Sequence, residues 1–257
     1  MNPFLSQCAV LLLLTPFMSI SVSAKAEYQH ITLGNNNIVD VVKIDNLKSL
    51  RLYLNNDQNQ AYKKFDAMSK ALKPCEKMTF AMNAGMYHAD FSPVGLYVEK
   101  FKKINNLNQQ IGFGNFFMQP NGVVAWNEFK AVIQTTQKYK ENSQKHYFKA
   151  KYATQSGPML VIDGKINSQF EPKSTSLKIR NGVGIKDNQL YFVISKNRIS
   201  FYDFAHIFKN KLGIQNALYL DGSISSAYIP QVHRNDQTFN LGPIVAYIEP
   251  KGRCDTP

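Results

Sequence analysis

The chain has 257 residues, and its 30 lysines and arginines against 18 acidic residues give a formal net charge of +12. This length allows one large domain or two small ones, and it is enough to bury a core without a dense disulfide framework. The positive balance indicates an acidic ligand, an anionic envelope surface or nucleic acid as a partner. Nucleic acid is not expected, because the sequence has no arginine-rich arm and no aromatic RNA-binding signature. The scattered lysines favour a solvated basic surface.

The N-terminal segment has the features of a signal peptide. Residues 1–24 contain no charged side chain, and a mainly apolar run over residues 8–20 is too short to span a bilayer comfortably. Val22-Ser23-Ala24 then supplies small residues for signal peptidase. The alternative is a short membrane anchor, since the usual N-terminal lysine or arginine is lacking. We expect residues 1–24 to be removed, leaving a periplasmic or secreted domain at residues 25–257 with no stable membrane span.

Two cysteines remain after this cleavage, Cys75 and Cys254. An exported protein meets oxidising conditions, and an even number of cysteines fits one disulfide. We therefore predict a Cys75–Cys254 bond, which would close most of the mature chain into a single loop.

The first part of the chain predicts two strands and a helix. Residues 38–44 and 50–54 alternate apolar and polar side chains, and we expect them to pair around Asp45-Asn46. Residues 61–73 change to a helical period, and Pro74 ends that helix.

The middle of the chain continues the strand pattern. Residues 78–82, 94–98 and 113–118 are predicted strands, the first of which runs into a turn that begins at Asn83. Residues 135–149 are polar and lysine-rich without apolar periodicity, which predicts a long exposed loop. Such a loop would either lie near a site or be a plain surface insertion.

The second half begins with two predicted hairpins. Residues 158–162 form a strand that ends at the favoured turn Asp163-Gly164. Residues 182–185 and 189–195 are expected to pair around Asp187-Asn188.

A helix and two more strands complete the chain. Ser200 and Asp203 form a capping box for a helix that continues to residue 212 and is closed by Gly213. Residues 217–220 and 243–248 are the last strands. Many strands with two good helices, mixed rather than alternating, predict an α+β fold: a single domain with mixed, mostly antiparallel sheets and a few helices.

Several familiar sites are excluded by their missing motifs. The sequence has no His-Glu-x-x-His, no Cys-x-x-Cys, no Gly-x-Ser-x-Gly, no P-loop and no dinucleotide fingerprint. The five histidines lack metal-ligand spacing, so no metal site is predicted.

The strongest candidate for chemistry is the segment at residues 217–226. An apolar run ends at Asp221, and Gly222 with three serines follows within five residues. Small residues after a strand can direct backbone N–H groups and hydroxyls to one point, which creates an anion-binding nest beside the carboxylate. The alternative is an ordinary β-turn, because Asp, Gly and Ser are common turn residues.

Three further polar clusters lie where a predicted strand meets a turn. Together the four clusters are Asn83-Ala84-Gly85-Met86-Tyr87, Gln155-Ser156-Gly157-Pro158, Arg180-Asn181-Gly182 and Leu220-Asp221-Gly222-Ser223-Ile224-Ser225-Ser226. In this order they resemble the motifs of the phosphodiester glycosidase family, the family of the mannose-6-phosphate uncovering enzyme, over residues 78–248. Ala84 and Ser223 stand where the family pattern has glycine, which indicates a separate branch.

The resemblance implies cleavage of a sugar-1-phosphodiester at its glycosidic C–O bond. Asp221 would be the base for water or the nucleophile, and Arg180 would bind phosphate oxygens. His88 would be a general acid, or simply an exposed loop histidine. The implied substrate-binding residues are Asn83, Gly85, Gln155, Ser156, Gly157, Gly222, Ser223, Ser225 and Ser226. Glu99 is the best remaining acid to partner Asp221, or it simply faces solvent. No cofactor is implied, and the need for a divalent cation is left open.

Two other functions compete with this hydrolase. One is a non-catalytic protein that uses the same cleft to bind an anionic, phosphate-containing glycan. The other is a phosphodiesterase that breaks the P–O bond. The hydrolase is the prediction, and these two functions are its alternatives.

Overall fold

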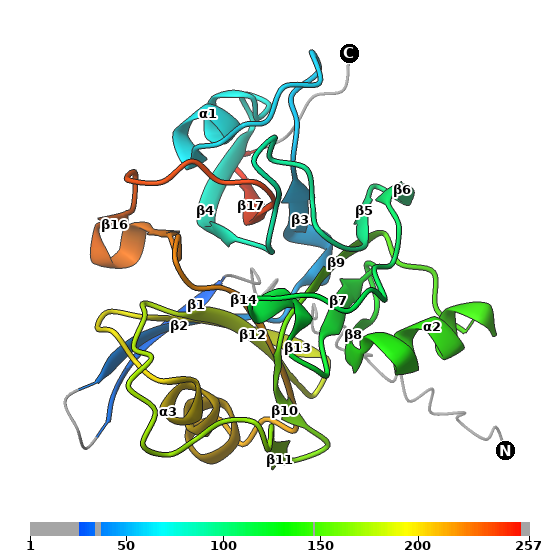
Figure 1. Ribbon diagram of the computed structural model, residues 1–257. Helices are drawn as coiled ribbons and strands as arrows, with labels where there is room; N and C mark the ends of the chain where they lie inside the picture. Colours follow the sequence, from blue (N-terminus) through cyan, green and yellow to red (C-terminus); the bar gives the residue numbers. More distant parts are fainter. Residues whose placement is uncertain (1–25, 34–36, 146, 253–257) are drawn as a thin grey trace, which may run out of the picture.

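The computed structural model describes residues 26–33, 37–145 and 147–252 (Figure 1). The predicted signal peptide at residues 1–24 lies outside these residues and stays a prediction. None of the helices in the described ranges is long and apolar enough to cross a membrane.

The largest layer is a seven-stranded sheet in the order β1-β2-β13-β12-β14-β10-β11. Its strands are β1 (Glu27–Thr32), β2 (Ile38–Ile44), β10 (Met159–Ile162), β11 (Lys165–Ile166), β12 (Asn181–Lys186), β13 (Gln189–Ser195) and β14 (Asn216–Asp221). The helix α3 (Phe201–His206) and a π-helical turn (Ile207–Lys211) pack their apolar residues on one face of this sheet. In Figure 1, α3 lies on the side of the sheet away from α1.

A second sheet has the order β16-β15-β4-β17-β3. Its strands are β3 (Leu50–Tyr53), β4 (Glu76–Asn83), β15 (Ala227–Ile229), β16 (Arg234–Asn235) and β17 (Ile244–Pro250). The helix α1 (Phe65–Lys70) buries Phe65 and Met68 on its outer face. A short 3₁₀ helix (Pro230–Val232) joins β15 to β16.

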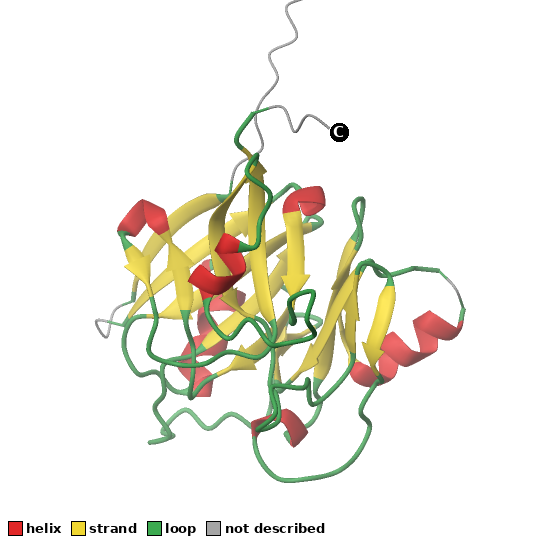
Figure 2. Ribbon diagram, turned by 90° about the horizontal axis from the view of Figure 1, so that it is seen from above, coloured by secondary structure: helices red, strands yellow, loops and turns green. Residues whose placement is uncertain are grey.

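The third sheet has the order β6-β5-β9-β7-β8. Its strands are β5 (Tyr97–Glu99), β6 (Lys102–Asn105), β7 (Gly122–Trp126), β8 (Ala131–Thr135) and β9 (Tyr152–Ser156). The helix α2 (Thr136–Gln144) follows the edge strand β8 directly. Strands of the three sheets lie side by side across the molecule (Figure 2).

One core joins the three sheets. Leu190 of the first sheet, Phe80 of the second and Trp126 of the third belong to a single cluster of buried side chains. All strand pairings within the described sheets are antiparallel. The prediction of a single α+β domain with mostly antiparallel sheets is therefore confirmed.

The predicted pairing of residues 38–44 with residues 50–54 is wrong, although both strands exist. β2 pairs with β1 and β13, whereas β3 pairs with β17 in another sheet. Asn46 does not form a hairpin turn but caps a 3₁₀ helix (Leu47–Ser49), its side chain accepting from the Lys48 N–H. This helix buries Leu47 and leads the chain from one sheet into the next.

Three other predicted segments also differ in the structure. The helix expected at residues 61–73 is confined to α1, and residues 113–118 contain a 3₁₀ helix (Asn115–Phe117) instead of a strand. Residues 135–149 contain α2 and are not a long loop. The Thr135 side chain caps α2 by accepting from the Lys138 N–H. This cap stabilises the start of a helix that has few apolar side chains to bury.

The predicted turns and capping box of the second half are confirmed. Asp163 with Gly164, and Asp187 with Asn188, have the positive φ angles of a two-residue hairpin turn. The Ser200 hydroxyl accepts from the Asp203 N–H at 3.0 Å and so caps α3.

The predicted disulfide involves Cys254, which lies outside the described residues, so the bond stays a prediction. The end of β17 runs beside the start of β4, and the Lys251 N–H donates to the Cys75 carbonyl at 2.7 Å. The described chain thus ends next to Cys75, as the predicted bond requires.

Candidate active site

The candidate site lies where strands of two sheets end together. Asn83 is the last residue of β4, Asn181 the first residue of β12, and Asp221 the last residue of β14. Asn181 pairs directly with Asp221 across the antiparallel ladder. Both asparagines are 0% exposed, whereas Asp221 is half-buried.

Side-chain hydrogen bonds hold this junction together. The Asn181 amide donates at 2.9 Å to both the backbone oxygen and the Oδ1 of Asn83. Its Oδ1 accepts from the Asp221 N–H at 2.9 Å. Asn83 Oδ1 also accepts from the Ser226 N–H, again at 2.9 Å. The two amides thereby connect β4, β12 and the loop after β14.

One donor of this network has no partner. The Nδ2 of Asn83 is buried and makes no hydrogen bond within the described residues. Its orientation is fixed because Oδ1 already accepts two N–H groups. An unpaired buried amide costs about 1–3 kcal/mol, and such an exception is a frequent mark of a ligand site.

Asp221 has an unusual environment for a carboxyl group. Burial raises its pKa from 3.8 to about 7, and the N–H groups of Gly222 and Ser223 lower it only in part. The Gly222 N–H donates to Asp221 Oδ1 at 2.6 Å. No described cation lies within ion-pair distance of this carboxyl. An acid with a pKa close to neutrality suits proton transfer.

The serine-rich loop after Asp221 is held by its own hydroxyls. Ser225 Oγ donates to the Asp221 backbone oxygen at 2.7 Å, and Ser226 Oγ donates to the Ile224 backbone oxygen at 2.8 Å. Both serines are buried, whereas Ser223 is exposed. Ser223 can therefore replace the family glycine without a steric conflict.

Gly222 lies directly against a tyrosine hydroxyl. A Cβ atom at this position would be 1.8 Å from the Tyr219 Oη, so no larger residue fits without a shift. Tyr219 is fully buried, and burial raises its pKa well above the usual range. The Tyr219 hydroxyl thus supports the loop that carries Gly222.

Arg180 is placed differently from what phosphate binding requires. It is 1% exposed, and its guanidinium donates to the backbone oxygens of Ile199 and Ser176 and to the Tyr219 hydroxyl. The guanidinium carbon lies 3.6 Å from the ring centroid of Phe201. Burial lowers the arginine pKa. These contacts make Arg180 the support of Tyr219 and of the surrounding loops.

A small cavity of about 220 Å³ lies beside the Asp221 loop. Gly222, Ser223 and Ser225 line one side, and the exposed cations Lys178 and Arg198 line the other. Neither cation forms an ion pair with any acid in the described ranges. These two side chains, rather than Arg180, offer positive charge to a ligand at this loop.

The side chains of the other predicted binding residues around β9 form hydrogen bonds within the protein. The Gln155 side chain accepts from the Leu96 and Asn108 N–H groups and donates to Asn108 and Thr136, which uses all four of its hydrogen-bonding positions. Ser156 is fully buried and donates to the Leu220 carbonyl at 2.7 Å. Both side chains therefore support the fold and are not available as ligand contacts.

The two glycines of the prediction are positions of close packing. A Cβ at Gly157 would be 2.7 Å from the Asn121 Cβ, and one at Gly85 would be 2.7 Å from the Thr154 Oγ1. Gly85 also has a φ of 151°, which disfavours other residues. Ala84, at a family glycine position, is buried in the common core and is accommodated there.

His88 lies on an exposed turn in which its N–H donates to the Ser92 carbonyl. The neighbouring Tyr87 lies near enough to Asp221 to be affected by its charge: burial, together with that charge, raises the Tyr87 pKa to about 12. The Tyr87 hydroxyl donates to the Asn240 carbonyl, and its ring packs where a Gly242 side chain would otherwise lie.

Glu99 does not partner Asp221. It lines a separate cavity with Arg51, and Tyr97 donates to its carboxylate at 3.2 Å. Burial raises the Glu99 pKa. The part of the chain that the structure describes also contains no group of three or more potential metal ligands.

Four residues of the site were absent from the predicted set. Asn181 stood within a recognised polar cluster, and its position after Arg180 at a strand start was the available signal. Tyr219 stood in the candidate segment at residues 217–226, two positions before Asp221, but was counted as part of its apolar strand. Lys178 and Arg198 carried no such signal, because only the fold brings them to the Asp221 loop.

The fold and this junction define an antiparallel α+β protein with a half-buried carboxyl group where strands of two sheets meet. A sequence profile of the phosphodiester glycosidases matches residues 76–245, and the chain belongs to this family. The chain is 36% identical over 181 residues to the uncharacterized protein YigE of Escherichia coli (strain K12), covering 70% of this chain and 69% of that protein.

Two solved structures share the fold. The catalytic domain of zebrafish N-acetylglucosamine-1-phosphodiester α-N-acetylglucosaminidase is similar with a TM-score of 0.58 and 11% identity, over 87% of this chain and 82% of that one. A protein of Burkholderia pseudomallei K96243, named as exported, is similar with a TM-score of 0.52 and 10% identity, over 82% and 73% of the two chains.

Proposed function

We propose that this chain is an exported hydrolase that cleaves the glycosidic C–O bond of a sugar-1-phosphodiester and releases a sugar and a phosphomonoester. The observation that carries the proposal is Asp221, whose pKa is raised by burial to about 7 and which has no second carboxyl group beside it among the residues that the structure describes. Family membership supports the same reaction class.

A single carboxyl group suits this substrate. Most glycosidases need a second acid, because an alcohol leaving group must be protonated. A phosphomonoester has a second pKa of about 6 and therefore leaves without a full proton transfer. The absence of an acid next to Asp221 in the described chain is thus compatible with a phosphate leaving group, whereas an ordinary glycoside would be a poor substrate.

The residues around Asp221 receive distinct roles in this proposal. Asp221 acts as the base that activates water, and the unpaired Asn83 Nδ2 donates to a substrate oxygen. Lys178 and Arg198 contact the phosphate from the cavity that they line with Ser223. These preorganised donors stabilise the negative charge that develops on the leaving phosphate.

Export places the substrate outside the cytoplasm. The signal peptide features of residues 1–24 support it, as does the structural similarity to a protein named as exported. We propose a phosphate-linked sugar of the envelope or its surroundings as the substrate.

The test is hydrolysis of a panel of sugar-1-phosphodiesters in oxygen-18 water. We expect the label on the anomeric carbon of the released sugar, and no product from Asp221→Asn. Asp163→Asn is the matched control, since Asp163 lies in an exposed hairpin turn. Label on the phosphate would identify a phosphodiesterase instead, and tight binding without product from any member would identify a glycan-binding protein.

A further inference from the structure

The positive charge of the chain is concentrated on one part of the fold. Residues 100–151 contain nine lysines and two glutamates, a net charge of +7 out of the +12 of the whole chain. These residues form most of the third sheet together with α2. Much of the net positive charge therefore belongs to this one sheet and its helix.

Two adjoining cavities lie along α2 on this side. One of about 400 Å³ is bordered by β8, and one of about 630 Å³ is bordered by β5 and β6. Both are lined by Tyr139, Ser143 and Phe148. We call the two cavities together the α2 groove. None of the residues around Asp221 lines it.

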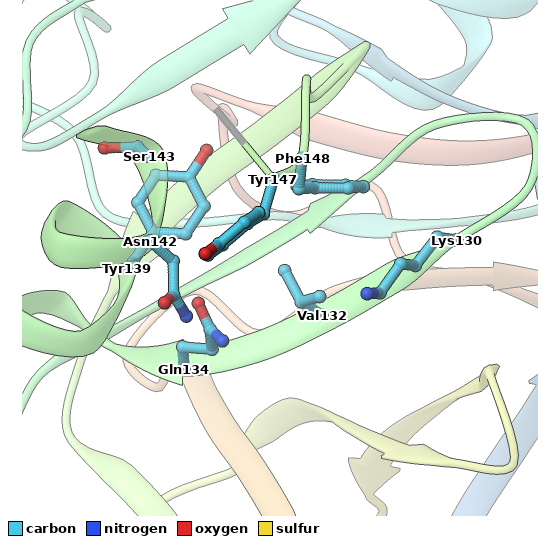
Figure 3. Close-up of a pocket in the computed structure, with 8 residues that line it drawn as sticks. All are labelled: Lys130, Val132, Gln134, Tyr139, Asn142, Ser143, Tyr147 and Phe148. Carbon is cyan, nitrogen blue, oxygen red and sulfur yellow. The ribbon is translucent and has the colours of Figure 1, made fainter. Parts of the chain in front are cut away.

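The groove follows from the periodicities of its two walls. Val132 and Gln134 alternate along β8 and therefore point to the same face, and Lys130, directly before the strand, continues this spacing. Tyr139 and Asn142 are three residues apart in α2 and share a face of the helix. Figure 3 shows these side chains from strand and helix facing a common space.

The lining combines aromatic rings with unused amides. Tyr147 is 77% exposed, and Phe148 is half-buried beside it. In the described chain, the side-chain amides of Gln134 and Asn142 make no hydrogen bonds. Aromatic faces accept the C–H face of a sugar ring, and amides can both donate to and accept from its hydroxyls.

Cations stand at both ends of the groove. Lys130 lines the first cavity, and Lys103 and Lys149 line the second. Within the described residues, none of the three forms an ion pair. Phe101 lies at the same rim, 50% exposed, with the Lys149 amine 5.4 Å from its ring centroid.

We propose that the α2 groove is a second binding site, separate from Asp221, for an anionic sugar chain. The sugar rings lie on Tyr147 and Phe148 and exchange hydrogen bonds with Gln134 and Asn142. The acidic substituents of the chain meet the lysines at the two ends. The site does not depend on the proposed hydrolysis, because its two cavities share no lining residue with the cavity beside the Asp221 loop.

The test measures binding of yeast phosphomannan by biolayer interferometry, with unphosphorylated mannan as the neutral sugar chain and inorganic polyphosphate as the sugar-free anion. We expect phosphomannan to bind at least about tenfold more tightly than either. Lys130→Gln combined with Lys149→Gln should weaken phosphomannan binding about tenfold, and Tyr147→Ala about fivefold.

Two controls match these variants. Lys209→Gln combined with Lys211→Gln removes the same charge from the helix side of the seven-stranded sheet, and Phe129→Ala removes an equally exposed aromatic ring outside the groove. Both should bind phosphomannan within about twofold of the unaltered protein.

The proposal is overturned if the groove variants bind like their controls, or if phosphomannan binds no better than polyphosphate. Binding to phosphatidylglycerol vesicles in a sedimentation assay, without binding to phosphomannan, would show an anionic lipid surface to be the partner instead.

Discussion

The side-chain amide of Asn181 lies 2.9 Å from both the backbone oxygen and the Oδ1 of Asn83, and this one contact fixes the start of β12 against the end of β4. Because the Oδ1 of Asn181 also accepts from the Asp221 N–H, the same side chain sets the backbone position of the candidate catalytic residue. We therefore expect a substitution of Asn181 to lower both the stability and the activity of the protein.

Asn181→Ala should lower the free energy of unfolding by about 2–3 kcal/mol, since it leaves buried groups of Asn83 and Asp221 unpaired. Turnover should fall in the same variant. Urea denaturation measures the first effect and phosphodiester hydrolysis the second. Asn142→Ala is the control: its amide makes no hydrogen bond in the described chain, so a change within about 0.5 kcal/mol is expected. Equal stability of the two variants would contradict the role of Asn181.

The activity should depend on the ionisation of Asp221. If the carboxylate is the base, kcat/KM rises about tenfold per pH unit below neutrality and levels off above the Asp221 pKa of about 7. The profile is measured between pH 4.5 and 9 on a phosphodiester substrate. A profile that falls with rising pH in this range would assign Asp221 the role of an acid instead.

Asp221→Asn should remove activity and raise stability. The folded-state pKa is higher than that of the unfolded chain, so the carboxyl destabilises the fold increasingly as the pH rises from about 4 to about 7. Asparagine removes the charge and keeps an acceptor for the Gly222 N–H. At pH 8 we expect a gain of at least about 1 kcal/mol in the free energy of unfolding, which shrinks towards zero near pH 4. The raised pKa would be refuted if the difference in unfolding free energy, Asp221→Asn minus the unaltered protein, were smaller at pH 8 than at pH 4.

The exposed cations and the buried arginine should behave differently. Lys178→Gln and Arg198→Gln should each raise the KM for a phosphodiester by about tenfold or more, since a hydrogen bond to a charged group contributes about 1.5–3 kcal/mol. Stability should stay within about 0.5 kcal/mol, because both side chains are exposed. Lys173→Gln, also exposed, serves as the charge-matched control.

Arg180→Lys should instead lower the free energy of unfolding by about 2–4 kcal/mol. Lysine reproduces neither the three directed hydrogen bonds nor the stacking on Phe201. Thermal unfolding measures the loss. A variant as stable as the unaltered protein, with only KM increased, would return Arg180 to the role of a phosphate ligand.

Much of the fold could be predicted because local patterns determine it. The hairpins at Asp163-Gly164 and Asp187-Asn188 and the Ser200 cap depend on neighbours within a few residues. The pairing of β2 with β13 joins strands about 150 residues apart in the sequence, and no local pattern encodes it. α2 was missed because its polar residues leave only a narrow apolar face, and its cap at Thr135 is the clearest remaining signal.

The sequence predicted where the candidate residues lie in the secondary structure better than which of their side chains are free to bind a ligand. The motifs placed Asp221 and Asn83 correctly at strand ends, because small and polar residues after apolar runs mark such ends. Whether Arg180 or Gln155 is free to contact a ligand depends on which distant backbone groups already occupy its hydrogen bonds. These hydrogen bonds form only when the loops at Ser176 and Asn108 fold against the two side chains, so the local sequence does not reveal them.

The contact between Gly222 and Tyr219 permits a sharper test than single substitutions. Gly222→Ala would place a Cβ atom 1.8 Å from the Tyr219 hydroxyl oxygen, so we expect a loss of about 2–3 kcal/mol in stability together with the loss of activity. Tyr219→Phe removes that oxygen, and the nearest remaining ring atom is then 3.1 Å away. By itself Tyr219→Phe should cost about 1 kcal/mol, since the hydroxyl is a partner of Arg180.

The double variant should therefore be more stable than the sum of the two single changes predicts, with a coupling energy of about 1–2 kcal/mol. Urea denaturation of the four proteins closes this double-mutant cycle. Strict additivity would mean that the loop moves away from Tyr219 at no cost, and the hydroxyl would then not hold Gly222 in place. Recovery of stability without recovery of activity would show that the loop geometry, and not only its steric fit, is needed beside Asp221.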